Sequence, residues 1–357
     1  MKILVLTGKF GMGHYSAAQT LQHQLEQDGH QVTLVDLFAY MLPDLAPAMY
    51  RAFSLMVTYA GGVYNLVHRM TRNMEGDAPA MGQLRHRLAQ LIEAEAPDLV
   101  LSTHPVCSGW VAQYKAEWDN TLPLVTCITD VTCHSEWIHP GTNAYLAPSA
   151  TVREGLIAKG VTPSRVIVTG IPVDSRFTCA HHRAGGPREL LIMGGGLGLI
   201  PCKNDFFESL DSLPNTHTTI LTGRNQRLYQ RLAGQYQNIE AVPFTRQVPY
   251  YMGRAHLMLS KPGGITTFEA ISARLPMLAW APFLEQEREN AYFLVSHGMA
   301  RIASKDESAC LAAIQATLYD DQALEGMRQA MDRLSSGLHK HAICALARSL
   351  ERKEHCV

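Results

Sequence analysis

The sequence predicts an α/β protein made of two doubly wound domains, each with a parallel sheet between layers of helices. Three observations support that prediction. Short apolar runs of strand length alternate with longer segments whose apolar residues recur at helical spacing, the pattern of βαβ units. Glycine-punctuated turns follow an early strand in each half, at residues 8–13 and 194–198. A chain of 357 residues is long for one core and natural for two.

Composition narrows the class of protein. Hydrophobic residues make up 46% and charged residues 18% of the chain, as in ordinary globular proteins, and a formal net charge of -1 gives no general support for nucleic-acid binding. The eight cysteines are scattered without a zinc-binding spacing, so we expect reduced thiols and no metal. The N-terminal apolar run is too short for a signal peptide, and no segment approaches a membrane span. A cytoplasmic protein is therefore expected, and contact with a membrane surface stays open.

The first half begins with a strand, a glycine turn and a helix. Lys2–Thr7 reads as a buried parallel strand, residues 8–13 as the turn and His14–Asp28 as the helix. A second strand over Gln31–Asp36 completes a βαβ unit. A dinucleotide fingerprint would require glycine at Ser16, so we reject NAD binding.

The segment 38–74 differs in character from its surroundings. It is rich in Met, Tyr, Phe and Leu, with Arg51, His68, Arg69 and Arg72 interspersed. Such a segment forms helices packed on the sheet, or an interfacial surface whose aromatic and Met side chains enter lipid headgroups while arginines face anionic lipid. Both interpretations stay open, and the second predicts binding to an anionic membrane surface.

Polar residues follow two further strands of this half. A strand beginning at Pro97 ends in a polar turn at His104, and the strand Leu124–Thr129 is followed by Asp130. Because parallel strands end at the same edge of a sheet, these groups should converge with His14 on one crevice. The other expected elements are a helix over Gly82–Ala94, a strand over Asn143–Ala147, a helix over Ala150–Lys159 and a strand over Arg165–Thr169.

The domain boundary is expected where hydrophobic periodicity is lost. The first domain would occupy residues 1–173, a linker 174–187, the second domain 188–335, and a closing C-terminal helix 336–357. In the second half, strands are expected at Glu189–Met193, Thr219–Thr222 and Ile239–Val242, and helices at Glu307–Leu318, Gln322–Ser335 and His339–Glu354.

The stretch 257–290 is the most informative part of the chain. It reads as a buried strand, a Pro-Gly-Gly turn and a helix, in which Gly263 and Gly264 allow close approach of a ligand and free amides suit a phosphate. Glu269, one turn into the helix, is placed to accept hydrogen bonds from a sugar diol. A strand over Met277–Trp280 then leads into a polar cluster. The pattern favours a nucleotide-sugar pocket over a plain βαβ unit with a solvated loop. The glycine turns at residues 8–13 and 194–198 both lack the Gly-Lys-Ser/Thr of a P-loop, so triphosphate hydrolysis is not indicated.

A set of short motifs occurs in a fixed order along nearly the whole chain. They are Gly11-Met12-Gly13-His14, Thr129-Asp130 with His134 and Trp137-Ile138-His139-Pro140, Gly170-Ile171-Pro172-Val173, Met193-Gly194-Gly195-Gly196, Gly223-Arg224-Asn225, Lys261-Pro262-Gly263-Gly264 with Glu269, and Gln286-Glu287 with Asn290. This order of motifs resembles the monogalactosyldiacylglycerol synthase and processive diacylglycerol glucosyltransferase family. Enzymes of that family have the GT-B fold, two Rossmann-like domains facing each other across a cleft, and are related to the peptidoglycan N-acetylglucosaminyltransferase.

The resemblance implies an enzyme that moves a hexose from a UDP-sugar to a lipid hydroxyl of diacylglycerol type, with inversion and without metal or cofactor, peripherally at the cytoplasmic membrane face. It implies that His14 is the base, since an imidazole of near-neutral pKa suits removal of the acceptor proton. By position, Gly195, Gly196, Gly263, Gly264 and Thr266 would surround the diphosphate, Glu269 the ribose, Arg224 and Phe244 the uracil, and Gln286, Glu287 and Asn290 the sugar, with Gly13, Asp130, His134 and Trp137 on the acceptor side.

Other functions remain compatible with the sequence. A related enzyme would act on a peptidoglycan lipid or a soluble natural product, and a UDP-N-acetylglucosamine 2-epimerase would need no acceptor. A non-catalytic UDP-sugar sensor would keep the donor site alone. The polar cluster from Asp130 to His139 argues for an acceptor and so against the epimerase.

Overall fold

The computed structural model describes residues 1–59, 82–178, 186–200, 203–280 and 284–354. The chain forms two compact units, one made of Met1–Val173 with Gly337–Val357 and the other of Asp174–Ser336. Residues 60–74 of the expected membrane-facing segment and residues 179–185 of the expected linker lie outside the described residues.

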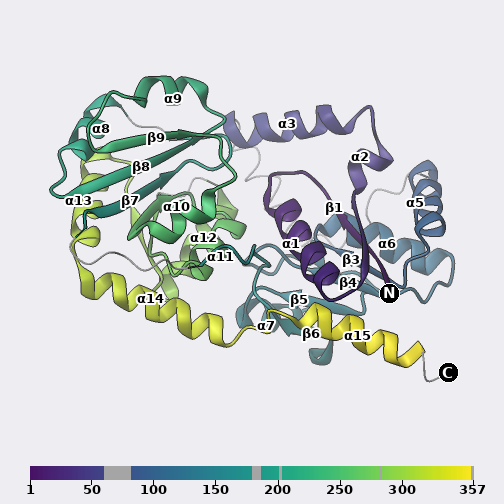
Figure 1. Cartoon of the computed structure of the whole chain (residues 1–357). Helices are drawn as coiled ribbons and strands as arrows, with labels where there is room; N and C mark the ends of the chain where they lie inside the picture. The colour runs from purple at the N-terminus through teal and green to yellow at the C-terminus, as the bar shows by residue number, and fades with distance from the viewer. Residues whose placement is uncertain (60–81, 179–185, 201–202, 281–283, 355–357) are drawn as a thin grey trace. The chain divides into compact units, whose positions relative to one another are not determined.

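The first unit is built on a six-stranded parallel sheet in the order β2-β1-β3-β4-β5-β6 (Figure 1). The chain returns from β2 to pair on the other side of β1 through β3, so the sheet is doubly wound. The strands are β1 (Lys2–Thr7), β2 (Gln31–Asp36), β3 (Leu99–Ser102), β4 (Leu124–Cys127), β5 (Ala144–Ala147) and β6 (Val166–Val168).

Both faces of this sheet are covered because alternate strand residues enter different cores. Ile3 and Val5 of β1 pack with helices α1 and α15, whereas Leu4 and Leu6 pack with α2, α5 and α6. A strand buried on both faces reads as a continuous apolar run, which is what β1 shows. The helices of this unit are α1 (Gly13–Gln27), α2 (Leu37–Met41), α3 (Ala46–Tyr59), α5 (Gly82–Glu95), α6 (Pro105–Glu117), α7 (Ala150–Ala158) and α15 (Ala342–Glu354), with short 3-10 turns at Ser135–Trp137 and Pro163–Arg165.

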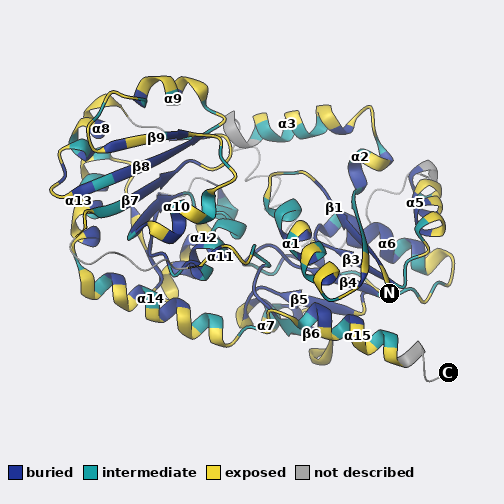
Figure 2. Ribbon diagram, in the orientation of Figure 1, coloured by how far each residue is buried: buried dark blue, intermediate teal, exposed yellow. Residues whose placement is uncertain are grey.

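The second unit repeats this architecture, with a parallel sheet in the order β12-β11-β10-β7-β8-β9. Helices α8, α9 and α13 pack on one face around Phe207, Ile220 and Ile314. Figure 2 shows buried strands beneath helices whose outer faces are exposed. The elements are β7 (Arg188–Met193), α8 (Asn204–Asp211), β8 (Thr216–Gly223), α9 (Gln226–Leu232), β9 (Ile239–Pro243), α10 (Val248–Arg254), β10 (Leu257–Ser260), α11 (Gly264–Ser272), β11 (Met277–Trp280), α12 (Glu285–Ser296), β12 (Ala300–Ala303), α13 (Glu307–Leu318) and α14 (Asp321–Ser336).

The α/β prediction with two parallel sheets is confirmed. The bounds predicted for β1, β2, β11 and α13 agree with the structure, while the strand predicted over Leu124–Thr129 ends at Cys127. Thr129 therefore lies in the loop after β4, where side chains need not point alternately to the two faces of the sheet. Sequence reasoning did not identify α6, α8, α9, α10, α12 or β12, and it read the start of α12 as a polar cluster after a strand. In the part of the chain that is described, every helix is too short or too polar to span a bilayer.

Candidate active site

The first cluster of polar side chains lies where β1, β3 and β4 end. His14 is the second residue of α1, and its ring Nδ1 lies 3.0 Å from the backbone carbonyl oxygen of Thr103 and 2.6 Å from Thr129 Oγ1. Thr103 follows β3 and Thr129 follows β4. The predicted convergence of strand-end groups on His14 is thus visible in the contacts of its ring.

The bond to Thr103 decides the protonation of the His14 ring. A carbonyl oxygen only accepts hydrogen bonds, so Nδ1 must carry the hydrogen when the ring is neutral. Nε2 then has its lone pair free to accept a proton. The arrangement can therefore act as a general base through Nε2.

Burial keeps His14 neutral. Desolvation lowers the pKa of the imidazole below its ordinary value, while the negative charge of Asp130 and the bond to the Thr103 carbonyl raise it in part. Asp130 is itself buried, and its Oδ2 accepts a hydrogen bond of 3.1 Å from Nε1 of the fully buried Trp137. The Trp137 ring centroid lies 6.2 Å from that of His14. Asp130 thus acts on His14 through its charge.

His104 is the neighbour that sequence reasoning left without a role. Its ring centroid lies 4.8 Å from that of His14, and its Nδ1 accepts a hydrogen bond from the Val106 N–H, capping α6. Burial, with the nearby His14, holds the pKa of His104 well below its usual range. His104 is therefore an uncharged ring that borders the site beside His14. The only sequence signal for it was its place at the end of a strand.

The remaining residues predicted for the acceptor side are close in sequence to this cluster. Gly13 is the first residue of α1, and His134 is buried at the N-terminal end of the Ser135–Trp137 turn. Met12, just before α1, is 56% exposed. Exposed apolar side chains also occur at Tyr40 in α2, Leu45 and Leu55. Tyr40, Leu45 and Leu55 lie within the described part of the segment 38–74, which is predicted to face a membrane.

In the second unit, two glycine turns pack against each other at the ends of β7 and β8. Gly198 and Gly223 have positive φ angles of 63° and 55°. A Cβ atom on Gly198 would lie 1.8 Å from the carbonyl oxygen of Thr222, so only glycine fits there. The Arg224 N–H donates to the Gly196 carbonyl at 3.0 Å.

Exposed backbone and a planar cation lie at these turns. Gly195 and Gly196 are exposed, with no atom near the position of a Cβ, so a ligand can approach their backbone closely. The guanidinium carbon of Arg224 lies 5.4 Å from the ring centroid of Phe244, whose side chain is 55% exposed. An exposed aromatic ring beside an arginine plane suits stacking on a nucleobase.

The N-terminus of α11 presents free amides. Gly263 is the N-cap residue and has no side chain with which to cap the helix. The first backbone hydrogen bond of the helix is donated by the Thr267 N–H to the Gly263 carbonyl oxygen at 2.8 Å. The N–H groups of Gly264, Ile265 and Thr266 therefore have no acceptor within the helix. Three outward amides at the positive end of a helix dipole suit a phosphate.

Helix α12 holds the loop before those amides. Asn290 is 1% exposed, and its Nδ2 donates to the Pro262 carbonyl at 2.8 Å. Glu287 Oε2 accepts from the Leu284 N–H at 3.3 Å, and its Oε1 lies 3.9 Å from Lys261 Nζ. Gln286 is partly buried in the first turn of the same helix. Asn290 and Glu287 thus hold the loop, and Lys261 adds a cation that sequence reasoning left without a role.

Glu269 has a carboxyl group whose pKa is raised. Desolvation raises its pKa to about 7, a hydrogen bond with Thr266 lowers it, and the charge of Asp174 raises it. Because Glu269 lies on α11 one turn after the free amides, a ligand that binds them can also reach it. Such a perturbed carboxyl group is typical of a functional site.

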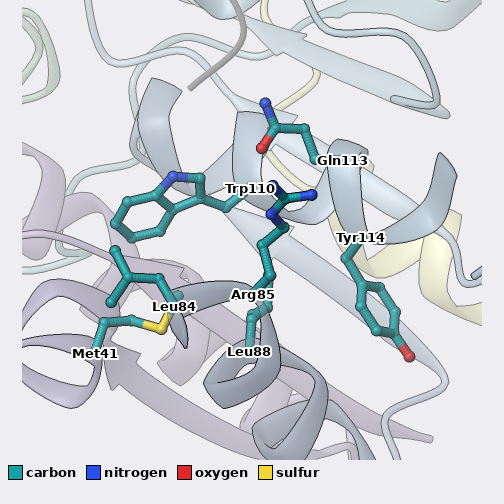
Figure 3. Close-up of a pocket in the computed structure, with 7 residues that line it drawn as sticks. All are labelled: Met41, Leu84, Arg85, Leu88, Trp110, Gln113 and Tyr114. Atoms are coloured by element: carbon teal, nitrogen blue, oxygen red, sulfur yellow. The ribbon is translucent and has the colours of Figure 1, made fainter. Parts of the chain in front are cut away.

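A pocket elsewhere in the first unit is too small for a substrate. Its volume is about 10 Å³, which corresponds to about one water molecule. Figure 3 shows apolar side chains around Arg85 and Gln113 at this place between α2, α5 and α6. Its lining residues are Met41, Leu84, Arg85, Leu88, Trp110, Gln113 and Tyr114. Among the described residues, no group of three or more His, Cys, Asp or Glu side chains is arranged to hold a metal ion.

Two family models match this chain. Residues 14–173 match monogalactosyldiacylglycerol (MGDG) synthase, and residues 191–342 match the glycosyltransferase family 28 C-terminal domain. The first half of the chain thus resembles MGDG synthase, and the second half resembles the C-terminal domain of glycosyltransferase family 28. The predicted resemblance is confirmed, and the protein is a UDP-sugar-dependent glycosyltransferase.

Two bacterial relatives match most of the chain. The chain is 28% identical over 347 residues to the processive diacylglycerol beta-glucosyltransferase of Bacillus cereus (strain G9842), covering 92% of this chain and 89% of the relative. The protein of the same name from Bacillus thuringiensis (strain Al Hakam) matches to the same extent.

Solved structures confirm the GT-B fold. The glycosyltransferase of kitacinnamycin has a TM-score of 0.67 at 15% identity, covering 98% of both chains. MurG of Acinetobacter baumannii has a TM-score of 0.64 at 16% identity, covering 98% of this chain and 99% of its own. The UDP-GlcNAc 2-epimerase of Neisseria meningitidis has a TM-score of 0.58 at 15% identity, covering 99% and 100%. At these identities the likeness concerns the fold alone.

Proposed function

We propose that this glycosyltransferase moves a hexose from a UDP-sugar to the free hydroxyl of a diacylglycerol-type lipid, with inversion at the anomeric carbon and without a metal ion. The observation that carries the proposal is the His14 ring, whose Nδ1 is held by Thr103 and Thr129 so that Nε2 is the basic nitrogen. The names of its relatives, which cover most of the chain, supply the acceptor class.

The reaction would be a single displacement. His14 Nε2 takes the proton of the acceptor hydroxyl as its oxygen bonds to the anomeric carbon. The bond from that carbon to the β-phosphate oxygen breaks, its electron pair stays on departing UDP, and the imidazolium later gives its proton to water. One inversion follows from one displacement.

The second unit would stabilise the leaving group. The free amides after Gly263 and the ammonium of Lys261 offer positive charge to the diphosphate, which is where negative charge grows during the reaction. Fixed cationic and dipolar groups make a metal ion unnecessary. Glu269 would hold the ribose, Arg224 and Phe244 the uracil, and Gln286 the sugar, together with the backbone of Gly195 and Gly196 near the phosphates.

A lipid acceptor fits the exposed apolar side chains of the first unit. Leu45 and Leu55 are each 58% exposed, and Arg51 on α3 is also exposed. Apolar side chains beside a cation are suited to the interface of an anionic bilayer. We propose that this part of the chain binds the cytoplasmic face of the membrane peripherally, where diacylglycerol is available.

The proposal is tested by UDP release from a panel of UDP-sugars, with and without mixed vesicles of diacylglycerol and anionic lipid. We expect release that requires one donor and the vesicles, and the glycolipid product should have the inverted configuration. Release without vesicles would indicate a soluble acceptor, and conversion of free UDP-sugars an epimerase. UDP binding without any release would favour the sensor.

A matched pair of variants tests the base. His14→Gln should lower turnover by at least about a hundredfold, because general base catalysis commonly contributes 10²–10⁴-fold, and should keep UDP-sugar binding. His23→Gln changes an exposed histidine on the same helix and should leave turnover unchanged. Equal activity of the two variants would remove His14 from the role of base.

A further inference from the structure

The His14 ring is held by two oxygen atoms where many catalytic histidines are held by a carboxylate. The Thr103 carbonyl oxygen and Thr129 Oγ1 lie 3.0 Å and 2.6 Å from Nδ1. Among the described residues, these two threonines supply the hydrogen bonds of the ring. The carbonyl selects the tautomer, because it cannot donate, and the nearer hydroxyl accepts from the same Nδ1–H.

We propose that Thr129 is a positioning residue for the base: its hydroxyl, with the Thr103 carbonyl, orients the His14 ring and stabilises the imidazolium that forms in the transfer. The inference rests on the proposed function, in which Nε2 takes the acceptor proton. It assigns to a neutral hydroxyl and a carbonyl the part that an aspartate takes in a His–Asp pair.

The physical reason is that the contact strengthens as the reaction proceeds. When Nε2 takes a proton, the ring becomes positive and its Nδ1–H becomes a stronger donor, so the bond to Thr129 Oγ1 is charge-assisted only from that moment. An interaction that is stronger in the transition state than in the ground state raises the rate of the chemical step. Thr129 therefore affects turnover more than substrate binding.

Thr103 also fixes the backbone that carries the ring. The buried Thr103 hydroxyl lies 3.0 Å from the His14 carbonyl oxygen and 2.8 Å from the Thr7 hydroxyl. Thr7 ends β1, Thr103 follows β3 and Thr129 follows β4, so three adjacent strands locate one side chain. A ring held at both its backbone and its Nδ1 has few orientations of Nε2 to choose among.

The charged and titratable groups around His14 fit this assignment. Asp130, after β4, raises the pKa of His14 through its charge and is itself bonded to Trp137 at 3.1 Å. His104, at the N-terminus of α6, faces the ring at 4.8 Å between centroids and stays neutral, because burial lowers its pKa. The charge that favours the imidazolium thus comes from Asp130 at a distance, and the direct contact comes from Thr129.

Nuclear magnetic resonance of the full-length protein tests the inference without any turnover. With ¹⁵N-labelled histidine, and with His14→Gln to assign the signal, wild type should show the hydrogen on Nδ1 at high pH. Thr129→Val removes the hydroxyl at nearly constant volume and should lower the pKa of His14, whereas Thr129→Ser should restore it. Thr126→Val, a buried control on β4 whose hydroxyl bonds Ser108 at 3.0 Å, should leave it unchanged.

Kinetics supplies the second readout. Thr129→Val should lower kcat about tenfold, the factor that the loss of one hydrogen bond produces, with the KM for the UDP-sugar unchanged and kcat recovered in Thr129→Ser. A wild-type ring with its hydrogen on Nε2, or a Thr129→Val variant with the pKa and kcat of wild type, would overturn the inference. A confirmed tautomer in a protein that transfers no sugar would instead count against the proposed function alone.

Discussion

The acidity of Glu269 predicts that donor binding depends on pH near neutrality. Its pKa is about 7 in the ligand-free protein, so the fraction ionised is about 0.1 at pH 6 and about 0.9 at pH 8. If the ribose hydroxyls bind only the carboxylate, the apparent affinity for a UDP-sugar rises about tenfold between these two pH values. At pH 7, binding should release about half a proton. Thr266→Val should move the midpoint to higher pH, because the Thr266 hydrogen bond lowers this pKa.

Isothermal titration calorimetry in buffers of different ionisation enthalpy measures both the affinity for the UDP-sugar and the number of protons released on binding. A UDP-sugar is the right ligand, because its diphosphate carries no group that titrates in this range. Glu269→Gln should bind more weakly and lose the pH dependence, whereas Glu240→Gln, an exposed glutamate of β9, should behave as wild type. A wild-type affinity that is flat from pH 6 to 8, or that falls as pH rises, would refute the reasoning.

Three further predictions concern side chains near His14 and near the N-terminus of α11. Asp130→Asn should lower the pKa of His14 measured by nuclear magnetic resonance, because the carboxylate raises it; a pKa equal to that of wild type would contradict this. Lys261→Gln should weaken UDP binding about tenfold and leave uridine binding unchanged, with Lys261→Arg in between, since the ammonium would contact only the diphosphate. Asn290→Ala should lower the free energy of unfolding in urea by about 2 kcal/mol, because it leaves the Pro262 carbonyl without its buried donor; an unchanged value would assign the side chain no part in holding the loop.

The elements that could be predicted are those with an unambiguous period. β1, with apolar residues at consecutive positions, and α13, with a capped helical pattern, have their predicted bounds. Helices α8, α9 and α10 are 7–8 residues long, so each offers only about two turns in which a period can appear. The end of β4 at Cys127 depends on where pairing with β5 stops, which apolar character alone does not show.

Which strand ends meet at one edge of the sheet was predictable, but not which atoms their side chains contact. Parallel topology brings the ends of β1, β3 and β4 to one edge, so the sequence predicts that groups after β3 and β4 lie near His14. The contacts of Thr103 and Thr129 with the His14 ring were not predicted. That Asn290 turns its amide to the Pro262 carbonyl is a matter of packing between α12 and a loop 28 residues earlier. No local sequence pattern indicates that these two residues, 28 positions apart, are in contact.

The sequence by itself determined the α/β architecture and the resemblance to MGDG synthase, because periodicity, glycine turns and the order of motifs can be recognised without coordinates. Only the tertiary structure decided which nitrogen of His14 is basic and which carboxyl group titrates near neutrality. The tautomer follows from a carbonyl 89 residues away, and the pKa of Glu269 follows from burial by the folded chain. Protonation depends on the solvent and charges around a group, and these exist only once distant segments have packed together.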